Sequence, residues 1–538
     1  MKVVLLGAAQ TVTGSCYMIE TGDVRFGIDC GMHQGNKEIE KRNYETELYI
    51  KPRLDFFLIT HAHIDHSGLL PRMAREGFSG PVYCTEPTAD LLEIMLLDSA
   101  HIQEMEATWE NTKLARKGSK QVVQPLYEQK DAEHINKMLK PIVYNVPFSP
   151  APGVTVTYRD AGHILGAAFL EVEVQEAEGT TKLIFSGDLG RPDALLLNDP
   201  ASPKLRKPDY LFIESTYGDR EHKNIGDSRA ELAEAIAYSH GQGGKVVIPA
   251  FAVERTQEVL YSLYMLRKEG KLPDDMPVFV DSPLAIRATE IFRKYPHYTD
   301  EDTRKLLAAN ENPLDLPNLR FTLSTEESQA INAYEGPAII ISASGMCNAG
   351  RIKHHLRHNI WNPKCSVVFV GYQGVGTPGR KIVDGAKEIS LFGEDLAINA
   401  RIFTINGFSA HAGQGQILDW VGEFVHDNMT IFLMHGEFKK QEVLASRMRE
   451  LFQAQVQIPA YLEELTLAPG KEPMVQVDGT RSLPKVNWHR VLSDSESKLS
   501  AIREHFDLLS TLPWEQQTEL RDEMLEINKK LLTFLTRI

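Results

Sequence analysis

The chain has 538 residues, 42% of them hydrophobic and 24% charged, which is enough apolar material for two or three domains with substantial cores. Its formal net charge of −15 is opposite to the basic balance typical of nucleic-acid-binding proteins, so composition alone does not predict such a partner. No run of about twenty apolar residues occurs, so we expect no membrane span. The five cysteines form no CxxC pair and their odd number argues against a disulfide framework, so we expect a cytoplasmic protein.

The first strands are predicted at the N-terminus. Residues 1–9 are apolar like a signal peptide, but the run is short and leads at once into the alternating stretch 11–19. We interpret both as strands of a sheet. Asp29 follows in the segment Gly-Ile-Asp-Cys-Gly, where it either orients a metal ligand or caps a turn at the end of a strand.

The next strand leads directly into a run of metal-binding side chains. Residues 54–60 are apolar and rich in strand formers, and they are followed by an H-x-H-x-D-H run formed by His61, His63, Asp65 and His66. The two first histidines can converge on one metal from an extended loop, whereas the aspartate and the last histidine can reach a second. Imidazole and carboxylate together suit zinc. Four such ligands in six positions are very specific for a metal site.

Two later residues follow strands in the same way. An alternating strand at 154–158 leads to His163, and an apolar strand beginning at Leu183 leads to Asp188, whose neighbouring glycines suit a backbone close to an ion. A lone Gly-Asp is usually a turn. However, a two-metal site needs a bridging carboxylate that holds the ions roughly 3.5–4 Å apart. These two residues therefore complete the pattern.

Further candidate residues follow strands in the second half of the chain. A strand at 210–213 ends in Glu214, while His411 lies in Phe-Ser-Ala-His-Ala-Gly and His435 in Leu-Met-His-Gly-Glu. Between them, strand-like segments such as 245–249 alternate with helical stretches, which predicts an inserted α/β domain. The chain must then return to the first domain so that both histidines reach the metals, and a long insertion is thermodynamically tolerable.

In this order and at these separations, the motifs resemble the metallo-β-lactamase superfamily. Those of the second half resemble the three accessory motifs of its β-CASP group, nucleases of the ribonuclease J and cleavage-and-polyadenylation endonuclease type. Further segments that match that group begin at Pro249, Asp281, Ser342 and Gly371, so the resemblance covers nearly everything from residue 1 to about 468.

The resemblance implies an α/β fold, a metallo-β-lactamase αββα sandwich with an inserted α/β β-CASP cap. The domains expected are 1–207 for the first part of the sandwich, 208–395 for the cap, 396–470 for the return segment and 471–538 for a C-terminal helical extension. The extension has helical apolar spacing with abundant charge, which suits packing or homodimerisation better than direct RNA contact.

The same resemblance assigns seven ligands to two zinc ions, or to manganese in the same nitrogen and oxygen site. One ion takes His61, His63 and His163, the other takes Asp65, His66 and His435, and Asp188 bridges the two. His435 also discriminates between substrates. Family members that act on RNA tend to have His there, whereas the DNA-repair branch tends to have Val.

Catalysis is expected from the two metal-binding aspartates, Asp65 and Asp188, and from an acid pair, Glu214 and His411. The metals lower the pKa of a bound water, which makes it a nucleophile at neutral pH. The carboxylate of Glu214 orients His411, which protonates the departing 3′ oxygen. The expected products carry 5′-phosphate and 3′-hydroxyl ends.

Contacts to substrate phosphates are expected from a Gly-rich turn entering a helix, whose free amides suit an anion, and, by the resemblance, from the Gly-rich segment that begins at Gly371. The residues are Ser344, Gly345, Arg351 and Arg380. Two positions depart from the family pattern. Glu254 stands where relatives usually have Gly, and Ala410 replaces a Gly, which weakens the resemblance to a 5′-end exonuclease pocket.

The sequence thus predicts a zinc-dependent ribonuclease acting on single-stranded RNA, with endonucleolytic cleavage favoured over 5′-to-3′ exonucleolytic cleavage. A metallo-hydrolase of a small ester, lactone or phosphodiester is an alternative. A scaffold subunit with an inactive site is a third hypothesis, against which the full set of seven ligands argues. We recognise no RNA-binding KH module in the chain.

Overall fold

A computed structural model describes residues 1–538 apart from 51–52, 223–224, 375, 477–487 and 537–538. It divides into two units, Met1–Leu483 and Pro484–Ile538. In the part of the chain described, no helix is both long and apolar enough to cross a membrane. All the predicted site residues lie in the first unit.

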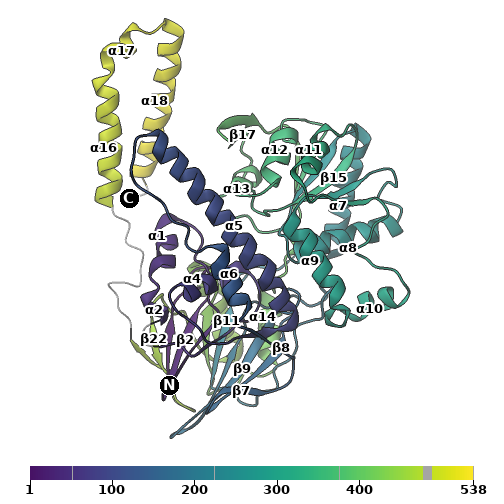
Figure 1. The fold of residues 1–538 in the computed structure, drawn as a ribbon, viewed down its shortest axis with the longest axis vertical. Coiled ribbons are helices and arrows are strands. Elements are labelled where there is room, and N and C mark those ends of the chain that lie inside the picture. Colours follow the sequence, from purple (N-terminus) through teal and green to yellow (C-terminus); the bar gives the residue numbers. More distant parts are fainter. Residues whose placement is uncertain (51–52, 223–224, 375, 477–487, 537–538) are drawn as a thin grey trace. The chain divides into compact units, whose positions relative to one another are not determined.

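Two sheets form the framework of the first unit (Figure 1). The first sheet has the strand order β23 (Met474–Gln476), β22 (Glu464–Thr466), β1 (Lys2–Leu5), β2 (Tyr17–Thr21), β3 (Val24–Ile28), β4 (Phe56–Leu58), β5 (Val82–Thr85) and β6 (Leu139–Ile142). The second has the order β21 (Gln455–Gln457), β20 (Thr430–Met434), β11 (Tyr210–Glu214), β10 (Gly179–Phe185), β9 (Ala168–Glu176), β8 (Val154–Asp160) and β7 (Phe148–Ala151). Strands β10, β11 and β20 are parallel, so the residues that follow them meet at one edge of the sheet.

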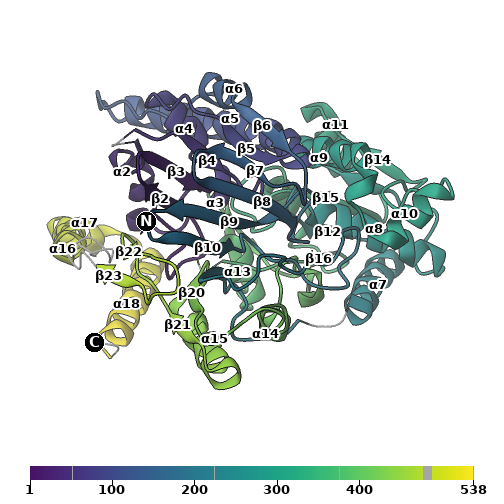
Figure 2. The ribbon, with the colours of Figure 1, turned by 90° about the horizontal axis from the view of Figure 1, so that it is seen from below.

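The two sheets face each other across a shared apolar core. The Tyr17 ring of β2 lies 5.0 Å from that of Phe185 in β10, which in turn stacks on Phe212 of β11 at 4.6 Å. Helices α4 (Leu70–Arg75), α5 (Glu86–Arg116) and α6 (Gln129–Asn136) lie on the side of the first sheet, and α14 (Gln414–Gly422) and α15 (Phe438–Phe452) on the side of the second (Figure 2). The predicted αββα sandwich is confirmed.

An inserted α/β cap follows β11 and is also confirmed. Its sheet is parallel throughout, with the order β14 (Leu319–Phe321), β13 (Val278–Val280), β15 (Ala338–Ser342), β12 (Lys245–Pro249), β16 (Ser366–Phe369) and β19 (Arg401–Thr404). Such a sheet is buried on both faces, and every residue of four of its strands is buried. Helices such as α7 (Ile225–Gln242), α8 (Arg255–Lys268), α9 (Pro283–Lys294) and α12 (Ile352–Asn359) connect its strands.

The elements run past two of the expected domain boundaries. Strand β19 pairs with β16, so the cap sheet continues to Thr404, beyond residue 395. Strand β23 pairs with β22, so the first sheet includes Met474–Gln476, beyond residue 470. Short strands at the edge of a sheet have weak sequence signals, because few of their side chains are buried.

The second unit is helical, as expected for the C-terminal extension. It contains α16 (Trp488–Glu504), α17 (Phe506–Thr511) and α18 (Trp514–Leu535). The Trp488 and Phe534 rings lie 5.9 Å apart, which brings the start of α16 near the end of α18. Several of its leucines remain about half exposed. Homodimerisation through this unit stays a prediction.

Candidate metal centre

The H-x-H-x-D-H run begins where β4 ends. Its first part, up to His63, is an extended loop, and the short helix α3 (Ile64–Ser67) carries its second part. His61 and His66 are buried, whereas His63 and Asp65 are partly exposed. The change from loop to helix turns the two halves of the run in different directions. As a result, four ligands close in sequence can serve two separate metal positions.

Four of the predicted ligands form a first group, namely His61, His63, His163 and Asp188. His61 Nε2 lies 3.1 Å and His163 Nε2 3.3 Å from His63 Nδ1. Both Nε2 atoms also lie 3.5 Å from Asp188 Oδ2. Three imidazole nitrogens and a carboxylate oxygen that converge in this way match the donor set of a tetrahedral zinc site.

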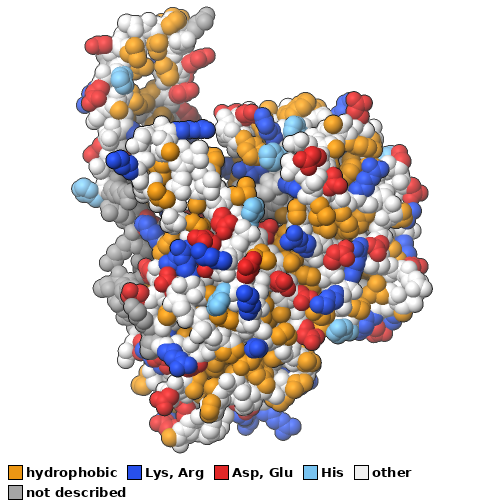
Figure 3. Space-filling view, in the orientation of Figure 1, with side chains coloured by type: hydrophobic (Ala, Val, Ile, Leu, Met, Phe, Trp, Pro, Cys, Tyr) orange, Lys and Arg blue, Asp and Glu red, His pale blue; other side chains and the backbone are white. Residues whose placement is uncertain are grey.

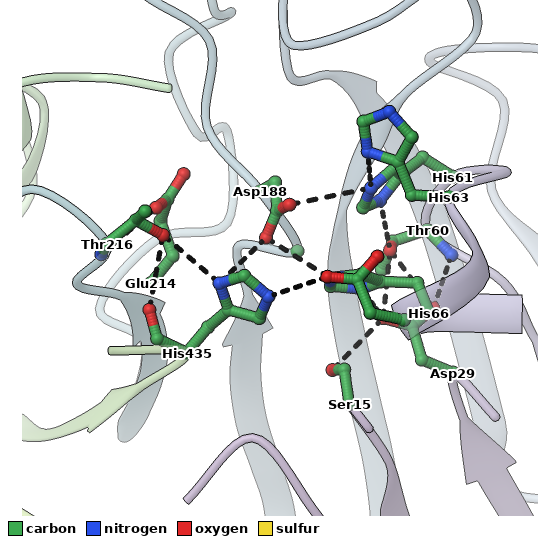
Figure 4. A network of polar contacts seen from close by, with 12 residues as sticks. Ser15, Asp29, Thr60, His61, His63, His66, Asp188, Glu214, Thr216 and His435 are labelled. Carbon is green, nitrogen blue, oxygen red and sulfur yellow. Dashed lines mark hydrogen bonds and ion pairs between the residues drawn. The ribbon is translucent and has the colours of Figure 1, made fainter. Parts of the chain in front are cut away.

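A second group consists of Asp65, His66 and His435. His435 Nε2 lies 3.4 Å from Asp65 Oδ2, and His66 Nε2 lies 3.2 Å from Asp188 Oδ1. Asp188 thus directs one oxygen to each group, and Figure 4 shows it between the histidines of both. This is the geometry that a bridging carboxylate needs.

The residues present fit two metal ions. His66 Nε2 and Asp188 Oδ1 are buried, and neither has a hydrogen-bond partner within the described chain, which is costly unless an ion binds both. Burial lowers the pKa values of His61 and His163 well below the ordinary range, and the neighbouring imidazoles lower them further. Both rings are therefore held neutral, the form that binds a metal.

Asp29 contacts the predicted ligand His66 and also Thr60 through hydrogen bonds. Its Oδ2 accepts a hydrogen bond from His66 Nδ1 at 2.7 Å, which leaves Nε2 of that ring for the metal. Thr60 donates its backbone N–H to Asp29 Oδ1 at 2.8 Å, and its hydroxyl lies 3.1 Å from His61 Nδ1. Of the two roles left open by the sequence, these contacts favour the orientation of a ligand.

His435 directly follows β20. It has a φ of +48°, a left-handed conformation that costs free energy for a residue other than Gly. Its N–H donates to Ala8 O at 2.7 Å and its carbonyl accepts from Ser215 N at 3.2 Å, which holds this conformation. Its Nδ1 also lies 3.1 Å from the hydroxyl of Thr216, a contact that no motif in the sequence predicted.

Glu214 and His411 meet beside the metal ligands. His411 Nδ1 lies 3.1 Å from Glu214 Oε1, which also accepts the N–H of Leu189 at 2.7 Å. Burial alone would lower the pKa of His411, but Glu214, with Asp188 and Asp65, outweighs it and raises this pKa to about 9. The His411 side chain is 21% exposed, so a proton donor held in its charged form faces the solvent side of the centre.

The four residues expected to contact phosphate are not all available for it. The guanidinium of Arg351 donates to Asp281 Oδ1 and Leu323 O, both at 2.7 Å, and the Ser344 hydroxyl donates to Asn348 Oδ1 at 2.7 Å. Arg380 is partly exposed and pairs with Asp384 at 2.9 Å. Gly345 lies in a turn against the Phe251 ring. Phosphate contact by these residues stays a prediction.

Models of three protein families match the chain in order. A metallo-beta-lactamase superfamily domain matches residues 18–188, a Beta-Casp domain matches 256–382, and a Zn-dependent metallo-hydrolase RNA specificity domain matches 395–459. The first range ends at Asp188, and the third includes both His411 and His435.

Relatives cover most of the chain. Ribonuclease TTHA0252 of Thermus thermophilus is 36% identical over 440 residues, which is 82% of this chain and 94% of that protein. Transcription termination factor FttA of Methanocaldococcus jannaschii is 32% identical over 473 residues, 86% of this chain and 71% of that protein. FttA of Methanosarcina mazei is 31% identical over 476 residues, 87% of this chain and 72% of that protein.

Proposed function

This chain belongs to the β-CASP ribonuclease family of metal-dependent hydrolases with a metallo-β-lactamase domain, and from that premise we propose that it uses two zinc ions to cut single-stranded RNA internally. The observation that carries the proposal is the position of Asp188, one oxygen toward each of two ligand groups, beside the His411–Glu214 pair. The RNA specificity model over residues 395–459 and the ribonuclease among the relatives support RNA as the substrate.

The protein's own residues have separate tasks in this proposal. Bound metal ions supply an activated water and neutralise the phosphate oxygens. Asp188 keeps the two groups of ligands in register, while Asp29 and Thr60 hold the imidazoles in the binding tautomer. His411 keeps its Nδ1 on Glu214 and gives a proton from Nε2 to the departing 3′ oxygen. The products then carry 5′-phosphate and 3′-hydroxyl ends.

Endonucleolytic cleavage is proposed over attack from a 5′ end. A 5′-terminal phosphate needs donors free to surround it, yet Arg351 and Ser344 already donate to other protein groups. A strand that only passes through needs no such terminal site. The reducing interior of a cell is the expected location, since all five cysteines are unpaired and buried.

End-labelled RNA and a DNA of matching sequence test the proposal with three proteins: the zinc-loaded wild type, Asp188→Asn, and Asp302→Asn as a control whose side chain is 81% exposed. We expect internal cuts in RNA from the wild type and the control, and none from Asp188→Asn. Release of mononucleotides from the 5′ end would establish the exonuclease instead. RNA left intact by the wild type would contradict the proposal.

A further inference from the structure

A pocket of about 570 Å³ lies away from the metal centre, beside the chain segment that connects β10 to β11. We call it the basic pocket. It is lined by Lys182, Pro203, Lys204, Leu205, Arg206, Lys207 and Phe424. The boundary expected between the first two domains, at residues 207 and 208, lies in this segment, whose composition is typical of a linker.

The charge of this lining is one-sided. Four of the seven lining residues are basic and none is acidic, in a chain with 73 acidic and 58 basic residues. Lys204, Arg206 and Lys207 are exposed, and none has an ion pair within the described residues. Over the face shown in Figure 3, acidic and basic side chains are intermixed. The basic pocket is therefore a local site of positive potential.

Two carboxylates lie against the same segment, but main-chain groups occupy them. Glu171 Oε1 accepts the N–H groups of Lys204 and Leu205, and its Oε2 pairs with Arg159 at 2.8 Å. Asp209 accepts the N–H of Lys182 at 2.8 Å through one oxygen and that of Gly470 at 2.8 Å through the other. These contacts fix the backbone. Lys182 Nζ donates to Arg206 O at 3.2 Å, whereas the side chains of Lys204, Arg206 and Lys207 face solvent.

The segment is held at both ends, so the pocket is preformed. Trp420 Nε1 donates to Ala201 O at 2.9 Å, and His426 Nε2 lies 3.0 Å from Pro208 O. Asp209 N donates to Lys182 O at 2.8 Å. Binding to charged side chains on a fixed backbone costs less conformational entropy than binding to a free linker.

Phe424 adds an apolar surface to the positive one. Its ring lies 5.0 Å from that of Trp420, at the end of α14, and is partly exposed. Aromatic rings next to basic side chains are the combination that binds single-stranded nucleic acid, because bases stack on the ring while cations contact the phosphates.

We propose that the basic pocket binds the backbone phosphates of single-stranded RNA at a point remote from the cut. The proposal rests on the proposed function for the identity of the ligand. Helix α14 lies between His411 and Phe424, and its nine residues alone span about 14 Å. A strand held at both the pocket and the metal centre must therefore be several nucleotides long, and the pocket selects longer RNA over very short fragments.

The test compares two triple variants with the same change of charge. Lys204→Ala, Arg206→Ala and Lys207→Ala remove the pocket cations. Arg116→Ala, Lys117→Ala and Lys120→Ala remove one Arg and two Lys that are also exposed and lie outside the pocket. Each set is placed in the Asp188→Asn background so that RNA stays intact, and the Kd is measured for RNAs of about 20 nucleotides at several salt concentrations.

We expect the pocket variant to raise the Kd about tenfold and to reduce the slope of log K against log salt by about 2, because three phosphate contacts are lost. The control should change neither. Unchanged binding by the pocket variant, or equal weakening by the control, would overturn the proposal. Cleavage of a dinucleotide, which has no second phosphate for the pocket, by the same variants with Asp188 intact reports separately on the proposed function. If wild type cuts no RNA but the pocket variant still binds it more weakly, only the proposed function fails.

Discussion

Asp188 and Asp281 are both buried and both lie beside histidines, yet their surroundings are opposite. In the cap, four side chains donate to the two oxygens of Asp281: His355 and Ser328 at 2.6 Å, and Thr322 and Arg351 at 2.7 Å. In the sandwich, Asp188 Oδ1 has no hydrogen-bond partner among the described residues, and imidazole nitrogens face both of its oxygens at 3.2–3.5 Å.

The difference separates a structural carboxylate from one that we propose binds metal. A buried carboxylate whose acceptors are all filled has no lone pair available for an ion. One that keeps an open acceptor in a buried site is stabilised when a cation binds there. An Asp–His contact alone therefore does not identify a metal site, whereas an open carboxylate oxygen within a group of several potential ligands points to one.

Among the variants near Asp188, replacement of His411, the proposed proton donor, should have the largest effect on the rate of RNA cleavage. His411 contacts Glu214 and belongs to neither ligand group, so His411→Ala should retain both metals. Loss of the general acid should slow RNA cleavage by about 10²–10⁴-fold. Single-turnover cleavage and metal analysis check both, with His101→Ala in α5 as a control. Cleavage at the full rate would refute the acid role.

Asp281→Asn tests the structural role of the carboxylate in the cap. The amide cannot accept from all four donors, and the guanidinium of Arg351 loses the carboxylate charge that it pairs with. We expect the free energy of unfolding to fall by about 3 kcal/mol, with metal content unchanged. Denaturant unfolding measures this against Asp275→Asn, whose side chain is 77% exposed. A loss of metal from Asp281→Asn would break the comparison.

The contribution of the Asp281 carboxylate should also appear in the pH dependence of the free energy of unfolding. Burial alone would raise the pKa of Asp281, but hydrogen bonds from His355, Ser328, Thr322 and Arg351 lower it to about 2. A pKa lowered on folding stabilises the protein above the unfolded value of about 3.9, and this stability is lost as pH falls toward 2. Wild-type unfolding free energy should therefore decline over this range more steeply than that of Asp281→Asn. Parallel pH profiles would mean that the carboxylate is not stabilised.

Asp29→Asn tests the support behind the ligands. The amide can offer its NH₂ group to His66 Nδ1, which favours the wrong tautomer for a metal at Nε2. Changes at such supporting residues typically weaken metal binding by about 10–100-fold. Competition with a chelator gives the affinity. An unchanged affinity for metal would show that Asp29 does not determine which tautomer His66 adopts.

Glu254 is intermediate between the two aspartates. Its buried Oε2 also lacks a partner among the described residues, but it belongs to none of the potential ligand groups. Its replacement should give the smallest change in stability. Burial and then Glu258 raise its pKa well above the ordinary range, so the carboxyl is neutral. The residue lies in a γ-turn with φ of +68° and ψ of −61°, which Gly adopts more readily.

Glu254→Gly should therefore raise the free energy of unfolding by about 1 kcal/mol and leave metal content unchanged. Thermal and denaturant unfolding measure the gain. A large destabilisation would show that the side chain contributes more through the N–H of Leu165, which donates to it, than the turn costs.

Much of the metal centre could be predicted because its ligands sit next to strong local signals. His61 to His66 follow one apolar strand, and Asp188 follows another. Because each lies at the end of a strand, we could predict that they meet at one edge of the sandwich. His435 and His411 needed the resemblance to a known family, since they are more than 200 residues away from Asp188 and no local pattern joins them to it.

The rest depended on contacts that local sequence does not encode. Arg351 follows a Gly-rich turn typical of phosphate binding, but its guanidinium is held by Asp281, 70 positions earlier. Thr60 and Thr216 lie next to the motifs, and their roles appear only from the ring nitrogens that they face. The basic pocket has charge as a signal, but its fixed backbone depends on Glu171 and Trp420 from other elements.

Metal content, measured by mass spectrometry on zinc-loaded wild type, Asp188→Asn and Asp281→Asn, tests the central claim most directly. The contrast between the two aspartates predicts two ions per chain in the wild type and in Asp281→Asn, and their loss from Asp188→Asn. Two ions retained by Asp188→Asn, or none bound by the wild type, would contradict it.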